Sequence, residues 1–152
     1  MKSKKHVDCL VGSTNIVTDT GVYPIADLYD RLFPETIHQF GTYGCRAEVR
    51  GARPAKETVL VKFNIVKDTL EGSPDQEFMM LDGSFKKLAD LVPGDVLAET
   101  YYHLGVVVAS VETKHHSPKV SMYTVANMLP THTYIVQLGF YRIVAHNNTD
   151  LE

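Results

Sequence analysis

Two positions near opposite ends of the sequence carry side chains that could cut or rearrange a peptide chain. The thiol of Cys9 can attack the carbonyl of the residue before it, Asp8, and convert that amide into a thioester. The side-chain amide of Asn147, which follows His146, can attack its own main-chain carbonyl, form a succinimide and cut the chain there. Both reactions need a fixed geometry, a stabilised oxyanion and a proton donor for the leaving amine. A lone cysteine or a lone His-Asn pair is weak evidence, so the chain between them must show whether they meet.

The sequence between these ends predicts an all-β domain. Short runs of β-branched and aromatic residues are separated by turn signals such as Asp-Gly and Pro-Gly. The ten glycines and seven prolines are typical of a fold with many turns. We expect strands over Val59–Val66, Gly105–Val111, Met122–Val125, Thr133–Leu138 and Tyr141–Ala145.

Three further stretches do not have a strand pattern. Ile25–Phe33 and Leu88–Leu91 each predict a helical turn or two. The stretch Phe40–Lys56 is polar, contains glycines and a proline, and shows no clear period. We therefore expect a long loop or insertion over Phe40–Lys56.

One internal repeat is visible. Ile16–Leu28 reads IVTDTGVYPIADL, and Phe78–Leu91 reads FMMLDGSFKKLADL. Each copy predicts a strand, a glycine turn, a second strand and then Ala-Asp-Leu. Chance similarity of two hairpins is the alternative, but the shared tripeptide after a shared hairpin favours duplication. Two related halves predict a pseudo-symmetric β domain, since a solenoid would need at least three copies.

Composition limits the classes of function that fit. The chain has 152 residues, 44% of them hydrophobic and 22% charged, which predicts one folded domain with a proper core. The net charge of -3 argues against a nucleic-acid partner, because such proteins are usually basic. We expect no membrane association, since no window approaches the roughly 18 consecutive apolar residues of a membrane span.

The cysteines and histidines do not have metal-site spacing. The two cysteines, Cys9 and Cys45, form no CxxC pattern and are too few for a disulfide framework. The seven histidines show no HxH or HExxH spacing, so a metal-dependent hydrolase is weakly supported. We expect no metal and no cofactor, and a reducing, cytoplasmic setting in which Cys9 stays free.

The sequence from Cys9 to Asn147 resembles an intein, or an intein-like Hint domain of the hedgehog/intein superfamily. The resemblance rests on four motifs in the family's order. The first is Cys9–Thr18 (CLVGSTNIVT) with Gly21 and Ile25–Leu28; the second is Ser73–Phe78 (SPDQEF) with Asp82-Gly83 and Leu91–Asp95; the closing two are Thr131–Tyr134 (THTY), and Gly139 with Ile143–Asn147 (IVAHN). The resemblance implies a pseudo-two-fold horseshoe of β-hairpins, with one or two short helices and no endonuclease domain.

The resemblance also implies roles for individual residues. Cys9 would be the nucleophile of the N–S acyl shift, and Asn147 the residue that cyclises, with His146 assisting it. His132 matches the family histidine that supports C-terminal cleavage. Ser73 and Asp75 match the second-motif positions that hold the N-terminal scissile peptide, although Ser-Pro-Asp is also an ordinary turn sequence.

Three departures from the family pattern affect these roles. Gln76 occupies the position of the second-motif histidine and cannot act as an acid, so we expect a slow acyl shift unless His115 or His116 substitutes. The strand before His132 lacks the usual Asp or Cys, and Ser121 or Met122 falls near that place. Residue 148 is Asn rather than the Cys, Ser or Thr that splicing requires.

These observations predict three parts of the chain: an N-terminal flank over 1–8, a Hint domain over 9–147, and a C-terminal flank over 148–152 whose Leu151-Glu152 resembles cloning residues. We expect a monomer whose partners are its own flanking polypeptides, joined at Asp8 and Asn148. The predicted function is autocatalytic splicing or self-cleavage. Release of an attached effector and a non-catalytic β-rich binding domain are the alternatives. Cyclisation at Asn148 with Thr149 as acceptor also stays open.

Overall fold

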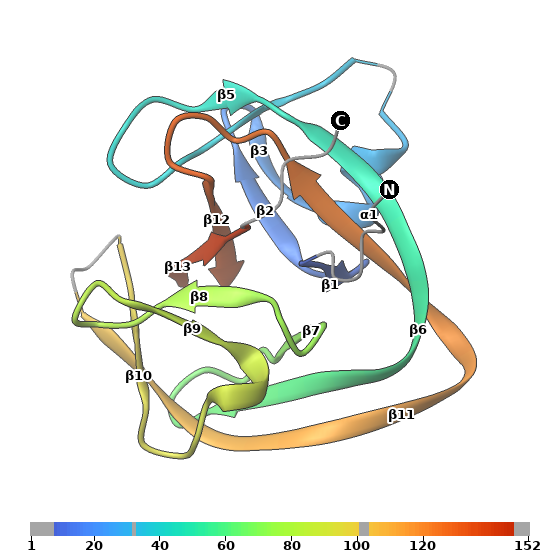
Figure 1. Cartoon of the computed structure of the whole chain (residues 1–152). Coiled ribbons are helices and arrows are strands. Elements are labelled where there is room, and N and C mark those ends of the chain that lie inside the picture. Colours follow the sequence, from blue (N-terminus) through green and yellow to red (C-terminus); the bar gives the residue numbers. More distant parts are fainter. Residues whose placement is uncertain (1–7, 32, 101–103, 148–152) are drawn as a thin grey trace, which may run out of the picture.

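The computed structural model describes residues 8–31, 33–100 and 104–147, and these residues form a body made mainly of β-strands (Figure 1). It has two short helical elements, α1 (Ile25–Tyr29) and the 3-10 helix η1 (Leu88–Asp90). The strands are β1 (Leu10–Val11), β2 (Asn15–Thr18), β3 (Gly21–Pro24), β4 (Thr36–Ile37), β5 (Cys45–Arg46), β6 (Glu48–Phe63), β7 (Leu70–Gly72), β8 (Glu77–Met79), β9 (Phe85–Lys87), β10 (Val96–Ala98), β11 (Gly105–Ala126), β12 (Thr133–Leu138) and β13 (Tyr141–His146).

The strands form two sheets. One has the order β1-β7-β6-β11-β10, and the other has the order β5-β4-β2-β12-β13-β8-β9 with β3 attached to β2. The long strands β6 and β11 pair along their length and curve around the outside of the body, while β12 and β13 lie inside this curve (Figure 1). The hairpin β12–β13 therefore forms the centre of the fold, and it ends at His146 beside β8.

The core contains the apolar faces of both sheets. Leu10 of β1, Phe78 of β8 and Tyr134 of β12 have no exposed surface and belong to one cluster. Residues of β12 are buried on both faces, which is why Thr133–Leu138 reads as a continuous apolar run rather than an alternating one. Strands β1 and β13, which adjoin Cys9 and Asn147, therefore pack into the most buried part of the molecule.

The internal repeat corresponds to two hairpins followed by a helical turn. Strands β2 and β3 lead into α1, and strands β8 and β9 lead into η1. Glycines with positive φ make the two turns, Gly21 at φ 153° and Gly83 at φ 89°. The predicted all-β horseshoe with one or two short helices is confirmed. The helix expected over Ile25–Phe33 is shorter, because α1 ends at Tyr29.

The prediction of a loop over Phe40–Lys56 is wrong for most of that stretch. Strand β5 and the first part of β6 lie there, and β6 pairs with β11 from Glu48 opposite Ala126 to Ala55 opposite Val120. Pro54 lies at a shift in the register, so its missing N–H does not interrupt a regular run of hydrogen bonds between the strands. Much of this part of β6 is exposed, so no alternation of apolar and polar residues marks it as a strand.

The predicted strands Gly105–Val111 and Met122–Val125 belong to one strand, β11. The polar residues between them lie at the outer bend of the β6–β11 ribbon, where the register shifts between His115 and Val120. Within the described residues, no helix is both long and apolar enough to cross a membrane.

Candidate active site at the two chain junctions

The main chain at Cys9 is held by β7 and the residue after it. The N–H of Cys9 donates to Oγ of Ser73 over 3.2 Å, and the N–H of Ser73 donates to the carbonyl of Cys9 over 2.9 Å. Gly72 makes this approach possible, because a Cβ at that position would lie 2.7 Å from the Cys9 carbonyl oxygen. The Asp8–Cys9 peptide is therefore fixed against Ser73, and both residues are buried.

Burial raises the pKa of the Cys9 thiol above its ordinary value, and the neighbouring Asp8 carboxylate raises it further. Hydrogen bonding to Ser73 acts in the opposite direction. The thiol is thus mainly protonated at neutral pH. An acyl shift at Cys9 needs the thiolate, so its rate should increase with pH.

The side chain of Asn147 is enclosed by hydrogen bonds and is only 5% exposed. Its Oδ1 accepts from Nε2 of Gln76 over 3.0 Å and lies 3.3 Å from the hydroxyl of Tyr134. Its Nδ2 donates to the carbonyl of Val125 over 2.6 Å and to Oγ1 of Thr124 over 3.2 Å. Both ends of the Asn147 carboxamide are therefore oriented, by three different parts of the chain.

Tyr134 connects the two junctions. Its buried hydroxyl lies 3.3 Å from Oδ1 of Asn147 and 3.4 Å from Oε1 of Gln76. Burial and the nearby charges of Asp8 and Cys9 raise the pKa of this phenol well above its ordinary value, so Tyr134 stays a neutral hydrogen-bond donor. The same side chain thus contacts Asn147 and is also affected by the charges of Asp8 and Cys9.

His146 is oriented by two neighbours. Its Nδ1 lies 2.9 Å from Oε1 of Glu77, and its ring stacks on Phe85 with the centroids 4.1 Å apart. If Nδ1 carries the proton donated to Glu77, Nε2 is the nitrogen that can accept or deliver a proton. The His132 ring approaches the His146 ring edge-on, with centroids 6.5 Å apart.

His132 lies in a tight loop after β11. Its φ of 58° is in the left-handed region, its N–H donates to the carbonyl of Met128 over 2.6 Å, and its carbonyl accepts from the N–H of Asn147 over 3.0 Å. Gln39 holds this loop from outside. The buried Gln39 amide donates to the carbonyl of Leu129 over 2.8 Å and accepts from the side chain of Thr131 over 2.6 Å.

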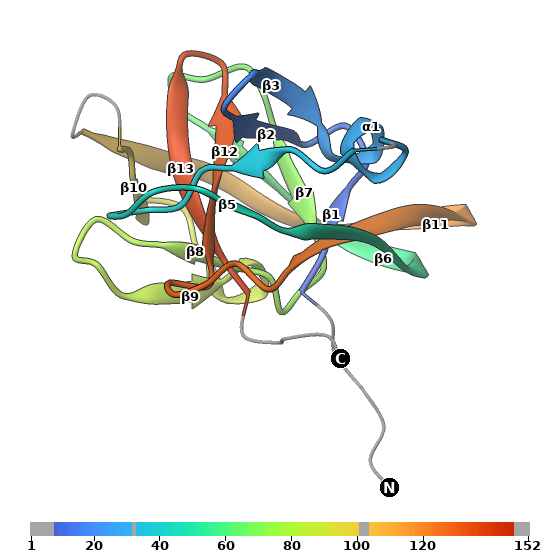
Figure 2. The same ribbon diagram turned by 90° about the horizontal axis from the view of Figure 1, so that it is seen from above.

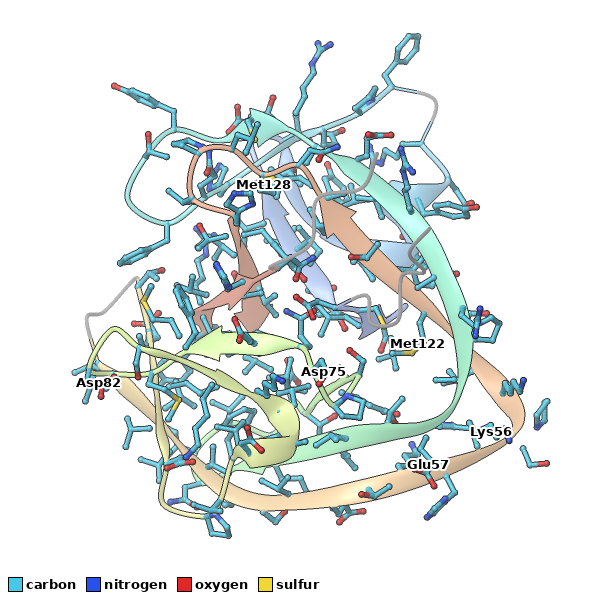
Figure 3. All side chains as sticks on the ribbon, in the orientation of Figure 1. Lys56, Glu57, Asp75, Asp82, Met122 and Met128 are labelled. Atoms are coloured by element: carbon cyan, nitrogen blue, oxygen red, sulfur yellow. The ribbon has the colours of Figure 1, made fainter. Side chains whose placement is uncertain are left out.

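Two second-motif residues lie in different surroundings. Gln76 is fully buried and, besides Asn147, approaches the carbonyl of His146 over 3.3 Å, so these contacts are with the C-terminal junction. Asp75 forms an ion pair with Lys87 across 3.5 Å and is partly exposed. Figure 3 shows Asp75 near the centre of the horseshoe, between the inner hairpins and the ribbon.

The suggested substitutes for the missing histidine lie elsewhere. His115 pairs with Glu57, and Glu57 lies at the outer bend of the ribbon (Figure 3). His116 forms a cluster with Glu71 and Thr58 on the ribbon. On the strand before His132, the contact with Asn147 comes from Thr124, whereas Met122 is a core residue opposite Val11 of β1.

Sequence reasoning assigned no role to four residues that contact the candidate site or hold it: Gln39, Glu77, Thr124 and Tyr134. Tyr134 lies in one of the motifs, and a tyrosine within a buried strand needs a partner for its hydroxyl, which is a usable signal.

Cys45 lies apart from these groups, with its thiol 3.6 Å from the sulfur of Met128. Asn148 and residues 1–7 lie outside the described residues.

Among the described residues, no three His, Cys, Asp or Glu side chains are grouped so that they could hold a metal ion. What the fold brings together is a buried Asp-Cys peptide, a buried Asn carboxamide and two histidines. Together with Tyr134, they line one polar site of an all-β body, in which Ser73 bonds the main chain of Cys9 and Gln76 bonds the side chain of Asn147. Figure 2 shows β1 and the end of β13 on the same side of the body.

Solved structures with this architecture are inteins and intein-like domains. The bacterial intein-like domain from Clostridium thermocellum is 21% identical, with a TM-score of 0.72 over 95% of this chain and 100% of its own. The TvoVMA intein is 14% identical, with a TM-score of 0.74 over 93% of this chain and 98% of its own. A DnaB intein from Synechocystis is 14% identical, with a TM-score of 0.73 over 93% of this chain and 99% of its own.

No protein-family model and no curated protein matches the sequence. The chain nevertheless has the Hint fold of inteins and bacterial intein-like domains, as the resemblance predicted. The likeness extends over nearly the whole of each chain. It corresponds to the minimal form of the fold, since the described residues contain no separate endonuclease domain.

Proposed function

We propose that this chain is a self-processing domain that cuts, and in a suitable context splices, the polypeptide in which it is embedded. The observation that carries this proposal is the meeting of the two junctions. Asp8, Cys9 and Asn147 are all buried, and the turn Ser73–Gln76 joins them, because Ser73 bonds the main chain of Cys9 and Gln76 bonds the side chain of Asn147.

At the first junction, the Cys9 sulfur attacks the carbonyl carbon of Asp8. The C–N bond between Asp8 and Cys9 breaks, a thioester forms, and the Cys9 nitrogen takes up a proton. Ser73 supports this step because its hydroxyl holds the Cys9 N–H and its N–H holds the Cys9 carbonyl. The raised thiol pKa makes the first step slow at neutral pH.

At the second junction, Nδ2 of Asn147 attacks the main-chain carbonyl carbon of the same residue. The peptide bond to residue 148 breaks, a succinimide forms, and the released amine carries the proton that Nδ2 gives up. His146, oriented by Glu77 and Phe85, supports the proton transfer. His132 supports it through its carbonyl, which holds the Asn147 N–H.

Ligation of the flanks needs a nucleophilic side chain at residue 148, and this sequence has Asn there. With Asn at this position, we expect the chain to cleave at one or both junctions without joining its flanks, and release of an attached effector fits the same chemistry. Replacing Asn148 with Cys should allow ligation of the two flanks. Ligation in the unmodified chain would instead indicate Asn148 as the cyclising residue and Thr149 as acceptor.

The test is intact-mass analysis of the purified chain over time, with and without an added thiol. We expect thiol-dependent loss of residues 1–8 and spontaneous loss of residues 148–152. Cys9→Ala should stop the first reaction and Asn147→Ala the second. A chain that keeps its mass under both conditions would favour a non-catalytic β-rich binding domain and overturn the proposal.

A further inference from the structure

We propose that Gln76, Tyr134 and Thr124 are catalytic residues of the C-terminal reaction, because together they surround the carboxamide of Asn147. This assigns Gln76 to the opposite junction from the one its motif position implies. The inference rests on the cyclisation of Asn147 proposed above. We call the three side chains and the carbonyl of Val125 the Asn147 cradle.

Different kinds of group in the cradle contact the oxygen and the nitrogen of the carboxamide. Nε2 of Gln76 and the hydroxyl of Tyr134 approach Oδ1, at 3.0 and 3.3 Å. Oγ1 of Thr124 and the carbonyl of Val125 accept from Nδ2, at 3.2 and 2.6 Å. Donors therefore face the oxygen of the carboxamide, and acceptors face its nitrogen.

This arrangement suits the chemistry of an amide nucleophile. An amide nitrogen is a poor nucleophile because its lone pair is delocalised onto the carbonyl oxygen. As Nδ2 gives up a proton and attacks, negative charge develops on Oδ1, and oriented donors in a buried site stabilise that charge. The acceptors polarise the N–H bonds of Nδ2, and the proton that leaves Nδ2 passes to the released amine with the help of His146. The cradle thus favours the imidate-like form of Asn147.

The residues of the cradle are fixed before the reaction. Gln76 is fully buried, and its nitrogen also approaches the carbonyls of Glu77 and His146 at 3.2 and 3.3 Å. These two carbonyls orient the amide with its nitrogen toward Asn147, which leaves the single proton of the Tyr134 hydroxyl for Oδ1 of Asn147, the nearer of its two acceptors. The phenol of Tyr134 stays protonated over the physiological range. Both donors to Oδ1 are neutral and preorganised.

The principal test is Gln76→Glu, which keeps the size of the side chain but makes its donor depend on pH. An ionised carboxylate cannot donate to Oδ1, whereas a protonated carboxyl group can. We expect cleavage after Asn147 to be slower than in the unmodified chain by about 10- to 100-fold at neutral pH. The ratio of the two rates should return toward one as the pH falls through the range in which the introduced carboxylate becomes protonated.

Other titratable groups near the cradle are Asp8, Cys9, Glu77, His132 and His146. Each is present in both proteins, so measuring the unmodified chain at every pH removes their contribution from the ratio. Thiol-dependent release of residues 1–8 is measured in the same samples. It should slow by less than C-terminal cleavage does, because Ser73 and not Gln76 makes the main-chain bonds at Cys9.

Two further variants keep the test decisive where Gln76→Glu does not fold, as judged by its circular dichroism spectrum. Tyr134→Phe removes one donor to Oδ1. Thr124→Val removes one acceptor from Nδ2, and Thr124→Ser restores it. We expect slower C-terminal cleavage in Tyr134→Phe and Thr124→Val, and recovery in Thr124→Ser.

The outcomes separate this inference from the proposed function. Unchanged C-terminal cleavage in folded Gln76→Glu, or in both of the other variants, overturns the cradle while leaving self-processing intact. Equal slowing of both junctions, with no recovery at low pH, indicates a purely structural role and also overturns it. No C-terminal cleavage in the unmodified chain overturns the cradle, and it overturns the proposed function as well only where residues 1–8 are also not released.

Discussion

The side-chain nitrogen of Gln76 donates to the side-chain oxygen of Asn147 over 3.0 Å, although the two residues are 71 positions apart in the sequence. Gln76 lies immediately before β8, and Asn147 immediately after β13, so the pairing of these strands creates the contact. The contact links the second motif to the C-terminal junction. Together with Tyr134, it makes the two ends of the domain a single polar site.

Cys9 rather than Cys45 should be the reactive thiol. Cys9 is clasped by Ser73 at the junction, whereas Cys45 lies on β5 with its thiol against Met128. Cys9→Ala should abolish thiol-dependent release of residues 1–8, as measured by intact mass. Cys45→Ser should leave the rate within about twofold, and an equal loss in both variants would contradict the assignment.

The Asp8 carboxylate should slow the reaction at the first junction, which releases residues 1–8. Its charge raises the pKa of Cys9, so Asp8→Ala should lower that pKa and increase the thiolate fraction at any pH below it. Each unit of pKa corresponds to about tenfold more thiolate. We expect release of residues 1–8 to accelerate about two- to tenfold at pH 7.

The full pH profile gives a second readout of the Asp8 prediction. In the unmodified chain, release should increase with pH well into the alkaline range, and in Asp8→Ala the whole profile should move to lower pH. Asp19→Ala is the control, because Asp19 is exposed and pairs with His38. A profile that does not move would mean that thiolate formation does not limit the reaction.

Glu77 should act through the orientation of His146. Its carboxylate lies 2.9 Å from Nδ1 of that ring, and both side chains are mostly buried. Glu77→Ala should slow cleavage after Asn147 by about tenfold or more, part of the 100- to 10,000-fold that general acid–base help supplies. The first junction should keep its rate, measured in the same mass spectra. Glu77→Gln, which can still bond the ring, should recover part of the loss.

Gln39 should be needed for the C-terminal junction although it lies outside every motif. It holds the loop that carries His132 through Leu129 and Thr131. Gln39→Leu leaves those buried groups unpaired and should lower the free energy of unfolding by about 1–3 kcal/mol in denaturant titrations. C-terminal cleavage should fall more than N-terminal cleavage.

Gln137→Leu provides the matched control for Gln39→Leu. Gln137 also makes side-chain bonds, but to Gly139 and Arg142 at the other end of the β12–β13 hairpin. Gln137→Leu should lower the free energy of unfolding without changing the ratio of the two cleavage rates. The same ratio in both leucine variants would show that Gln39 has no special connection to the junction.

The sequence predicts the strands that are buried and misses the ones that are not. Thr133–Leu138 matches β12 in full, because a β-branched apolar run before a glycine turn has few other solutions. The first half of β6 has no such run. It is held by main-chain bonds to β11 and faces solvent over much of its length, so its side chains need no period.

The residues of the candidate site also divide into those that the sequence indicates and those that it does not. Cys9, His146 and Asn147 could be selected from their chemistry and their places at the ends of the motifs. The contacts of Gln76 and Thr124 with Asn147 depend on strand pairings between distant segments. A threonine on a strand or a glutamine in a turn gives no local sign of such a partner.

Because Asp8 and Asn147 lie close to the same tyrosine, the polypeptide approaches and leaves this domain through one small area of its surface. A carrier protein would therefore need to open only a short gap between two of its own neighbouring residues to accommodate the domain. Insertions of that kind are tolerated at exposed loops, where the surrounding strands and helices stay in register. Under the proposed function, a carrier could then complete its own folding while the domain is still in place, and the two folds would remain independent until the junctions are cut.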